Sequence, residues 1–536
     1  MFESLGANNA HRSFLCHPGH GCPGLLARSR GNAASCWGGT GNARGRGMRR
    51  PSLPPLAALV LALAACSSAP VSSNNKGGPA TDGGPGTDSG PASDGGPAAD
   101  GGPATDGAAP NVSIDQANVP RDPASSIGAD VVASAAAANN AFAFDLYAQV
   151  RAGQTTPGNL LTSPLSASLA LTMTYAGAQG QTATEMATTL HYGSAASSIF
   201  DGQNGLSQAL ASRAATALAA GQQLATEMQQ PAPSPDDYLF QVVNSVWGEK
   251  TYPWAQPFLT TLAKSYGTGV YLEDFINQWD PARQTINAWV SAQTGDKINN
   301  LLAPGSLDDQ TRMVLVNAVH LKLPWASPFQ TSATASASFT RADGSTVSAS
   351  FMNQTLNVPY VDDGKAQIVA LPLVGQQLSV VIALPHGDLA TYEAGLTAGT
   401  PSALAGPTAF ANVQLSLPKV AFTSPTFSLA KPLQAMGMVQ AFDANNANFK
   451  GMCPNPPDGE NLYVSDVLQK AMVAMQETGV EAAAATAVVI AGSGAEPPPP
   501  VPMVVNRPFV MAIVDGPTGT ILFVGHIEDP TDAGSP

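Results

Sequence analysis

A stretch near the C-terminus, from Gln476 to Pro500, constrains the fold most, because its composition suits no single resting structure. It reads QETGVEAAAATAVVIAGSGAEPPPP, so that its alanines favour a helix, its β-branched residues a strand, and its glycines and prolines an exposed loop. Read with a period of two from Val480, it has almost no bulky side chain before Val488, and such a strand can enter between two others without displacing much packed volume. We therefore expect an exposed segment that can become a central strand, where its backbone groups are satisfied on both sides. An alanine-rich surface helix or linker is the alternative interpretation.

The composition limits the classes of partner. The chain has 536 residues, of which 44% are hydrophobic and 12% charged, and this allows a large globular core with room for tails. The net charge of -14 and the low count of 24 Lys and Arg argue against nucleic acid or an anionic membrane surface as the partner. We therefore expect a protein ligand.

Motifs for catalysis, metals and cofactors are missing from the sequence. It contains no GxSxG elbow, HExxH, P-loop or nucleotide fingerprint, so we expect neither an enzyme nor a cofactor. The pairs Cys16-His17 and His20-Cys22 look like metal ligands, but they lie in a Gly/Arg-rich stretch without helical or strand period, and we predict no metal site. The remaining cysteines, Cys36, Cys66 and Cys453, leave one thiol in the globular part and exclude a disulfide framework there.

The N-terminal region has the features of an export signal. From Met48 the sequence MRRPSLPPLAALVLALAACSS has two arginines and then an apolar run of roughly a dozen residues, which is typical of a secretory signal. Leu63 to Cys66 resembles a bacterial lipobox, so we predict a signal peptide over residues 48–65, a lipid anchor at Cys66, and a protein in the bacterial cell envelope or outside the cell. A plain signal peptide with a fortuitous cysteine is the alternative. We expect residues 1–47 to be absent from the mature protein.

Two regions follow the predicted anchor. Residues 66–125 are rich in Gly, Pro, Asp and Ala and repeat a GGPATD-like unit, so they cannot bury enough apolar surface to fold and are expected to form a disordered tether. Residues 126–536 are expected to form the globular domain.

Local signals predict several elements of this domain. A helix is expected over residues 141–150, and Ser166 is expected to cap a second helix that ends at Gly177. Thr182 and Glu185 have the spacing of a capping box for a third. Residues 201–237 are expected to be helical, residues 311–329 to contain a buried strand, and residues 515–519 to join a terminal hairpin.

Part of the C-terminal stretch resembles the hinge motif of the serpins, protease inhibitors that insert a cleaved loop into a β-sheet. The hinge residues by this resemblance are Glu477, Gly479, Val480, Glu481, Ala482, Ala483, Ala484, Ala485 and Thr486. Val480 departs from the family pattern, which usually has a small hydroxyl residue there, but it is compact. Further segments between Asn159 and Pro530 also resemble serpin blocks in the family's order. The resemblance implies an α+β serpin fold, with three β-sheets, about eight to nine helices and an exposed reactive loop that can insert into the main sheet.

The function implied by this resemblance is irreversible suicide inhibition of a serine endopeptidase, with a cysteine protease as the rarer target. The family's usual spacing from Glu477 places the reactive bond between Ser493 and Gly494, with Ala491 and Ala495 as alternative positions. Because no Lys or Arg occurs between Val480 and Asn506, we predict an elastase-like or subtilisin-like target. We expect a monomer.

The resemblance also implies a polar cluster that controls opening of the sheet. Gln469 stands where many relatives have a histidine, and the matching partners are Ser163, Ser166 and Asn317, with Trp325 near the upper opening. Glutamine can donate and accept, so the cluster can persist, but a histidine-based pH response would be lost there. Among the histidines, His191, His320, His386 and His526 are expected to be core or surface residues. The competing interpretations are a serpin-fold binding protein on the cell surface that never inserts its loop, and a surface lipoprotein whose tether matters more than its domain.

Overall fold

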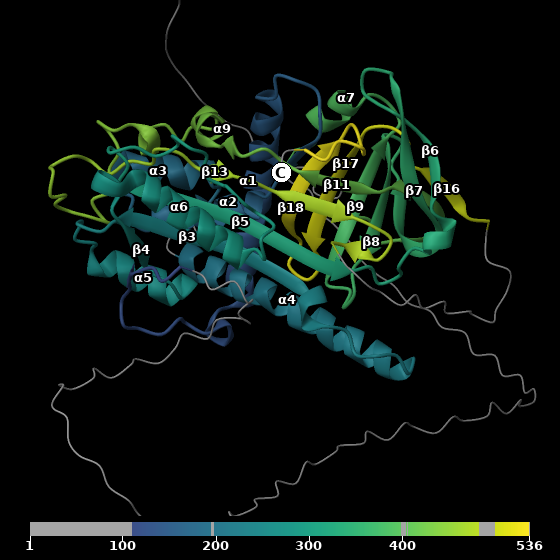
Figure 1. Cartoon of the computed structure of the whole chain (residues 1–536), viewed down its shortest axis with the longest axis horizontal. Helices are drawn as coiled ribbons and strands as arrows, with labels where there is room; N and C mark the ends of the chain where they lie inside the picture. The colour runs from purple at the N-terminus through teal and green to yellow at the C-terminus, as the bar shows by residue number, and fades with distance from the viewer. Residues whose placement is uncertain (1–109, 194–197, 398–403, 405, 482–498, 535–536) are drawn as a thin grey trace, which may run out of the picture. The chain divides into compact units, whose positions relative to one another are not determined.

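The computed structural model describes residues 110–193, 198–397, 404, 406–481 and 499–534 (Figure 1). Several predictions fall outside these residues: the segment 1–47, the signal peptide, the anchor at Cys66 and most of the tether. The hinge residues Ala482 to Thr486 and the reactive-bond positions between Ala491 and Ala495 also lie outside them.

The first large sheet has seven strands and contains the beginning of the hinge. Its order is β1-β4-β3-β5-β15-β14-β11, and its longest pair is the antiparallel β3 and β5. The strands are β1 (Ile114–Asp115), β4 (Val270–Glu273), β3 (Leu239–Glu249), β5 (Met313–Pro324), β15 (Gly479–Val480), β14 (Met472–Met475) and β11 (Val420–Thr423). Strand β5 is buried at nearly every position, as expected from its apolar run.

The second large sheet has nine strands and receives the chain after the loop. Its order is β16-β10-β7-β8-β9-β17-β18-β2, and β6 pairs with β7. The strands are β16 (Val501–Val504), β10 (Phe410–Pro418), β7 (Thr346–Asp362), β8 (Ala366–Pro372), β9 (Leu378–Pro385), β17 (Phe509–Asp515), β18 (Thr520–Ile527), β2 (Leu160–Thr162) and β6 (Ala335–Thr340). The predicted terminal hairpin is confirmed as β17 and β18. A third sheet pairs β12 (Phe427–Ser428) with β13 (Leu468–Gln469).

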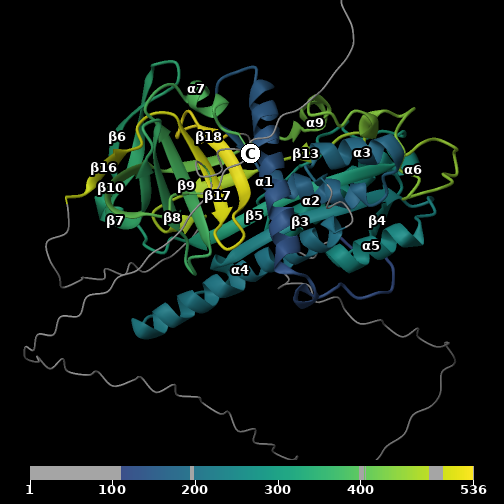
Figure 2. The ribbon, with the colours of Figure 1, turned by 180° about the vertical axis from the view of Figure 1, so that it is seen from behind.

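Eight α-helices occur in the described ranges. They are α1 (Ala129–Ala152), α2 (Pro164–Tyr175), α3 (Gly180–Thr189), α4 (Ile199–Glu227), α5 (Gln256–Tyr266), α6 (Phe275–Gln293), α7 (Leu389–Ala394) and α9 (Ala430–Ala435). Helix α2 contacts β3 and β5 of the first sheet and β18 of the second, and α1 lies beside it (Figure 2). Every residue of α2 up to Thr174 is buried, and the hydroxyl groups of Thr172 and Thr174 donate to carbonyls one turn earlier, those of Ser168 and Ala170. Three sheets and these eight helices confirm the predicted α+β class.

Two predicted helix caps are wrong. Helix α2 begins after Ser163, with Pro164 as its first residue, and Ser166 lies inside it. Helix α3 begins after Gln179, and Thr182 is likewise interior. The polar side chains find partners outside their own helices: Ser166 bonds to Asn244 of β3, and Glu185 accepts from the backbone N–H groups of residues 439 and 440. A capping pattern in the sequence does not show whether such a side chain bonds to the end of its own helix or to another element.

The folded part begins before the expected boundary at Ser126. Strand β1 pairs with β4, and the Asp122 N–H donates to the Lys264 carbonyl at 2.9 Å. The Arg121 side chain donates to Asn204 and Ser207 of α4, at 2.9 and 2.6 Å. Residues 110–125, which were expected to belong to the tether, are therefore packed on the domain.

Candidate functional site

The hinge enters the first sheet through the two residues of β15. Gly479 pairs with Pro324 and Val480 with Leu323 on the β5 side, while Val480 pairs with Met475 on the β14 side. The side chain of Val480 is buried at 2% exposure, which a compact apolar residue tolerates without a polar partner. The first residues of the loop are therefore already strand residues in the intact chain.

Beyond β15, the strands on either side are not joined directly. Among the described strands, β5 and β14 each pair with β15, and one further bridge joins Leu315 of β5 to Val467, ahead of β14. We call the stretch between this bridge and β15 the seam. Along the seam, no ladder joins β5 to β14 in the part of the chain that the structure describes, and an added strand could satisfy their backbone groups.

Glu481 directly follows β15 and lies at a bend in the backbone. It has a φ of +52°, which is costly for a residue with a side chain, and its N–H donates to the Ala474 carbonyl at 2.7 Å. Its carboxylate contacts Lys297 at 2.6 Å and His320 of β5 at 3.0 Å. Burial opposes ionisation of Glu481, but hydrogen bonds with His320 and Lys297 outweigh it and lower the pKa of this carboxyl. These two contacts hold the bend in place.

Glu477 lies at the other end of β15, in the turn between β14 and β15. Its carboxylate accepts from the Thr334 hydroxyl at 2.9 Å and contacts Lys419 at 2.8 Å, while its carbonyl accepts from the Phe329 N–H. Burial opposes ionisation, but hydrogen bonds, first with Lys419, lower the pKa of Glu477. Both hinge carboxylates are thus ionised and partnered.

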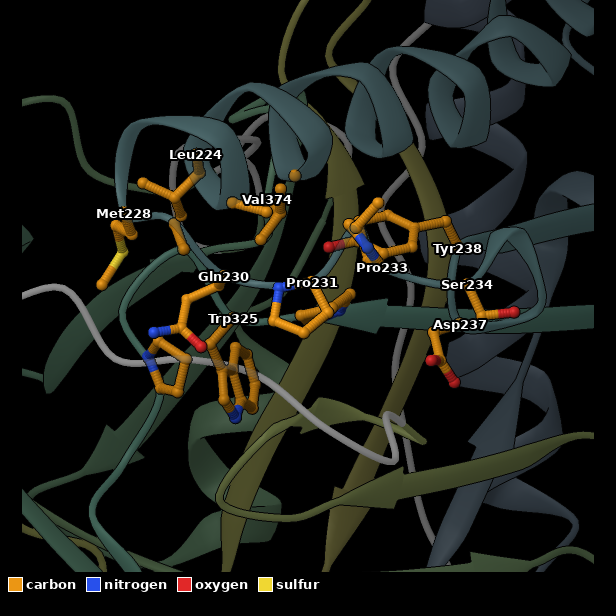
Figure 3. Close-up of a pocket in the computed structure, with 16 residues that line it drawn as sticks. Leu224, Met228, Gln230, Pro231, Pro233, Ser234, Asp237, Tyr238, Trp325 and Val374 are labelled. Carbon is orange, nitrogen blue, oxygen red and sulfur yellow. The ribbon is translucent and has the colours of Figure 1, made fainter.

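Trp325 lies where the hinge meets the end of β5. Its indole N–H donates to the Gln476 carbonyl at 2.7 Å, and its backbone N–H donates to the Thr478 carbonyl at 3.0 Å. A cavity of about 390 Å³ adjoins the indole (Figure 3). Leu224 and Met228, at the end of α4, line one side of it, and the proline-rich segment around Pro231 lines another. On the side of the cavity, the Trp325 indole therefore lacks packing partners.

Gln469 joins three elements at the other end of the seam. Its carbonyl oxygen accepts from the Thr162 hydroxyl at 2.6 Å and the Ser163 N–H at 3.0 Å. Its amide donates to the Ser163 carbonyl at 2.9 Å and the Asn317 side chain at 3.1 Å. Ser166 is not a partner of Gln469, since it donates to Asn244 at 2.9 Å, and Asn244 stands opposite Asn317 in the β3–β5 register.

The structure thus brings Ser163, Asn317 and Gln469 together, puts Ser166 one strand away, and places Trp325 at the hinge. Sequence reasoning missed four contacts: Thr162, Asn244, Lys297 and the role of His320. Asn317 and His320 carried a detectable signal, because both are polar residues within an otherwise apolar strand.

The described part of the chain offers neither a metal site nor a membrane-spanning helix. No group of three or more His, Cys, Asp or Glu residues there could hold a metal ion. None of its helices combines the length and apolar character needed to span a bilayer. Burial raises the pKa of the Cys453 thiol, which keeps this cysteine in its neutral form.

Comparisons with known proteins agree with this geometry. The family model of serpins, serine protease inhibitors, matches residues 137–530. Human leukocyte elastase inhibitor is 30% identical over 403 residues, covering 73% of this chain and 98% of that protein. Human serpin B4 is 33% identical over 405 residues, covering 73% and 98%. The crystal structure of tengpin, a thermophilic serpin, in its native state matches with a TM-score of 0.64 at 25% identity and covers 77% of this chain and 97% of tengpin.

Proposed function

The chain belongs to the serpin family of serine protease inhibitors, and from this we propose that it is an irreversible, loop-insertion inhibitor of an elastase-like or subtilisin-like endopeptidase. The observation that carries the proposal is the seam between β5 and β14, which begins directly below the two hinge residues already in the sheet. After Glu481 the sequence continues with small residues, Ala482 to Thr486, so the chain that would extend β15 has few side chains to obstruct it.

The proposed reaction uses the chemistry of the target and the strand geometry of the inhibitor. The protease serine oxygen attacks the carbonyl carbon of the residue before the reactive bond, the C–N bond breaks, and the new amino terminus takes a proton. The freed segment then extends β15 along the seam. At about 3.3 Å per residue, a dozen inserted residues would carry the acylated protease roughly 40 Å. Distortion of the protease active site on arrival would prevent hydrolysis of the ester, which depends on close alignment of its catalytic groups.

The choice of target rests on the loop sequence. With no Lys or Arg between Val480 and Asn506, a trypsin-like pocket that requires a cationic side chain finds none, whereas small apolar pockets accept Ala, Val and Ser. The similarity to human leukocyte elastase inhibitor supports the same class. We expect SDS-resistant complexes with elastase and subtilisin, and a much slower reaction with trypsin. Faster inhibition of trypsin would contradict the proposed target class.

A substitution in the hinge tests insertion itself. Ala484→Arg places a long cation on the segment that must enter the sheet, so cleavage should continue while the covalent complex disappears. Ala337→Arg, at an exposed position of β6, is the matched control and should inhibit as the wild type does. An Ala484→Arg variant that still traps the protease in an SDS-resistant complex would exclude insertion as the mechanism.

The reactive bond is proposed to lie between Ser493 and Gly494. Mass spectrometry of the denatured complex should find a fragment that begins at Gly494, because acylation itself creates this amino terminus, and alkaline hydrolysis of the ester should free the other fragment with Ser493 at its carboxyl terminus. Cleavage after Ala491 or Ala495 would shift the reactive bond by two residues and leave the mechanism in place. Cleavage N-terminal to Val488 would leave too short a segment to insert and would contradict the mechanism.

We also propose export and a lipid anchor at Cys66, supported by the apolar run and the Leu-Ala-Ala-Cys sequence at residues 63–66. Mass spectrometry of the mature amino terminus should find an acylated Cys66. A mature terminus elsewhere, or an unmodified cysteine, would rule out the anchor.

A further inference from the structure

A second cavity lies on the flank of the first sheet, away from the hinge. It has a volume of about 320 Å³, at the lower end of the range of roughly 300–1,000 Å³ found for ligand pockets. Its walls come from α2, α4, α6 and β3. Strand β4 pairs with β3 only over residues 246–249, so among the described strands the earlier part of β3 has a neighbour on one side only, and the cavity adjoins this stretch.

Apolar side chains line one part of this cavity, and polar groups line the rest. Leu169 and Met173 project from α2, Phe240 and Val242 from β3, and Trp289 from α6. This apolar part of the wall would exclude water from a ligand's apolar body and so favour binding.

One charged side chain, Arg121, lines the cavity. Its guanidinium donates to the Asn204 side chain and the Ser207 hydroxyl, and both partners are neutral. In the described residues Arg121 has no carboxylate within ion-pair distance, although the chain carries a net charge of -14. Burial lowers the pKa of Arg121, as expected of a cation that is partly desolvated and has no counter-ion.

The position of this cation is determined by the segment ahead of the family match. Residue 121 precedes residues 137–530, and the β1 strand and the Asp122 backbone fix the segment on the domain. The Arg121 stem also lies against Gly267, where an added Cβ would come within 3.1 Å of the Arg121 Cδ. The cation in this cavity therefore comes from a segment outside the family match, and contacts with α4 and Gly267 hold it in place.

We propose that this cavity binds a small organic carboxylate with an apolar body. The carboxylate would pair with the Arg121 guanidinium, whose planar fork suits two carboxylate oxygens, and the apolar body would lie on the side chains from α2 and β3. Neither half of the site suffices alone, because an exposed ion pair contributes little and a small apolar molecule has little area to bury.

Calorimetric titration with 4-phenylbutyrate tests the site on the folded protein from residue 110 onward. We expect one saturable site, with 4-phenylbutanol, which lacks the charge, and acetate, which lacks the apolar body, each binding at least about tenfold more weakly. Arg121→Gln should weaken the acid about tenfold and leave the alcohol unchanged. Lys431→Gln makes the same charge change at an exposed position of α9 and should have no effect.

A second variant separates loss of binding from loss of folding. Ala211→Trp adds a large side chain at the exposed α4 lip of the cavity and leaves Arg121 in place, so it should abolish binding of the acid with an unchanged thermal midpoint. The proposal is overturned if the wild type shows no saturable binding, if Arg121→Gln binds the acid as well as the wild type, or if Ala211→Trp does. None of these outcomes bears on protease inhibition, which is assayed separately.

Discussion

At the scale of single residues, the carboxylates of Glu477 and Glu481 hold the chain on either side of β15 through their contacts with Lys419, Lys297 and His320. Glu477 precedes β15 and Glu481 follows it, and each carboxyl has a lowered pKa in the folded protein. A carboxyl with a lowered folded pKa stabilises the fold above its unfolded pKa of about 4.3, and this stabilisation is lost as the pH falls through the folded pKa. Acid should therefore weaken the contacts that the Glu477 and Glu481 carboxylates make on either side of β15.

Glu481→Gln isolates one of these contributions. The amide cannot pair with Lys297 and His320 as a carboxylate does, so at pH 7 the variant should melt about 2–4 °C below the wild type. The difference should shrink and then disappear as the pH falls through the lowered folded pKa of Glu481, where the wild-type carboxyl itself becomes protonated. Differential scanning calorimetry between pH 7 and pH 3 measures both values. Glu460→Gln, at an exposed position, is the control, and a gap that stays constant with pH would show that ionisation of Glu481 is not the cause.

Gln469→Glu tests whether the cluster needs a donor as well as an acceptor. The Gln469 amide donates to the Ser163 carbonyl and the Asn317 side chain, and an ionised Glu would present only acceptors to these oxygens. Its pKa should therefore be raised in the folded state, so that the variant is destabilised by about 2–3 kcal/mol at neutral pH and recovers as the pH falls below that raised pKa. Thermal midpoints from pH 8 to pH 5 measure this, with Gln222→Glu on the exposed face of α4 as a pH-independent control.

At the scale of elements, burial on both faces made some strands predictable, and tertiary contacts made the helix ends unpredictable. Strands β5, β17 and β18 are apolar along their length because both faces are covered, so composition alone reveals them. The caps at Ser166 and Thr182 were wrong because each hydroxyl bonds outside its helix.

The candidate site was predicted only in part for a related reason. Ser163, Asn317 and Gln469 were assigned through resemblance, since residues so far apart in sequence share no local pattern. Lys297 and Asn244 had no local signal at all, because their positions near Glu481 and Ser166 depend on how the strands and helices pack. A long polar side chain in a solvated loop or at a strand edge looks the same in sequence whatever it contacts.

The contact between α4 and the terminal hairpin gives a further test. Arg213 of α4 donates to both carboxylate oxygens of Asp515, at 2.6 and 3.2 Å, and Asp515 is fully buried. Arg213→Ala should lower stability by about 3–5 kcal/mol, because it leaves a buried carboxylate without its cation. The double change Arg213→Met with Asp515→Leu removes both charges and should recover part of the loss. Chemical denaturation measures all three proteins, and additive losses would contradict a direct pairing.

At the scale of the whole molecule, the segment before α1 joins parts of the domain that lie far apart in sequence. Its strand β1 extends the first sheet, and the Asp122 carbonyl accepts from Asn204 and Gln208 of α4. A chain that starts at residue 126 loses these bonds, whereas one that starts at residue 110 keeps them. We expect the shorter chain to melt about 3–6 °C lower. Equal thermal midpoints for the two chains would mean that the folded domain starts at Ser126, as expected from the sequence.

The proposed loop insertion requires the intact chain to be less stable than the same chain with its loop inserted, and this difference can be measured directly. Each residue added below Val480 would complete backbone hydrogen bonds to β5 and β14 and bury its share of the seam. At about 1 kcal/mol for each net hydrogen bond, a dozen inserted residues should raise the thermal midpoint by more than about 10 °C. Cutting the loop of the isolated protein within residues 482–498, verified by mass spectrometry, should therefore give a nicked form that melts well above the intact one. Ala484→Arg, cut at the same bond, is the control and should show no rise, because its loop cannot enter. A wild-type protein whose nicked and intact forms melt at the same temperature has no stored free energy for trapping a protease.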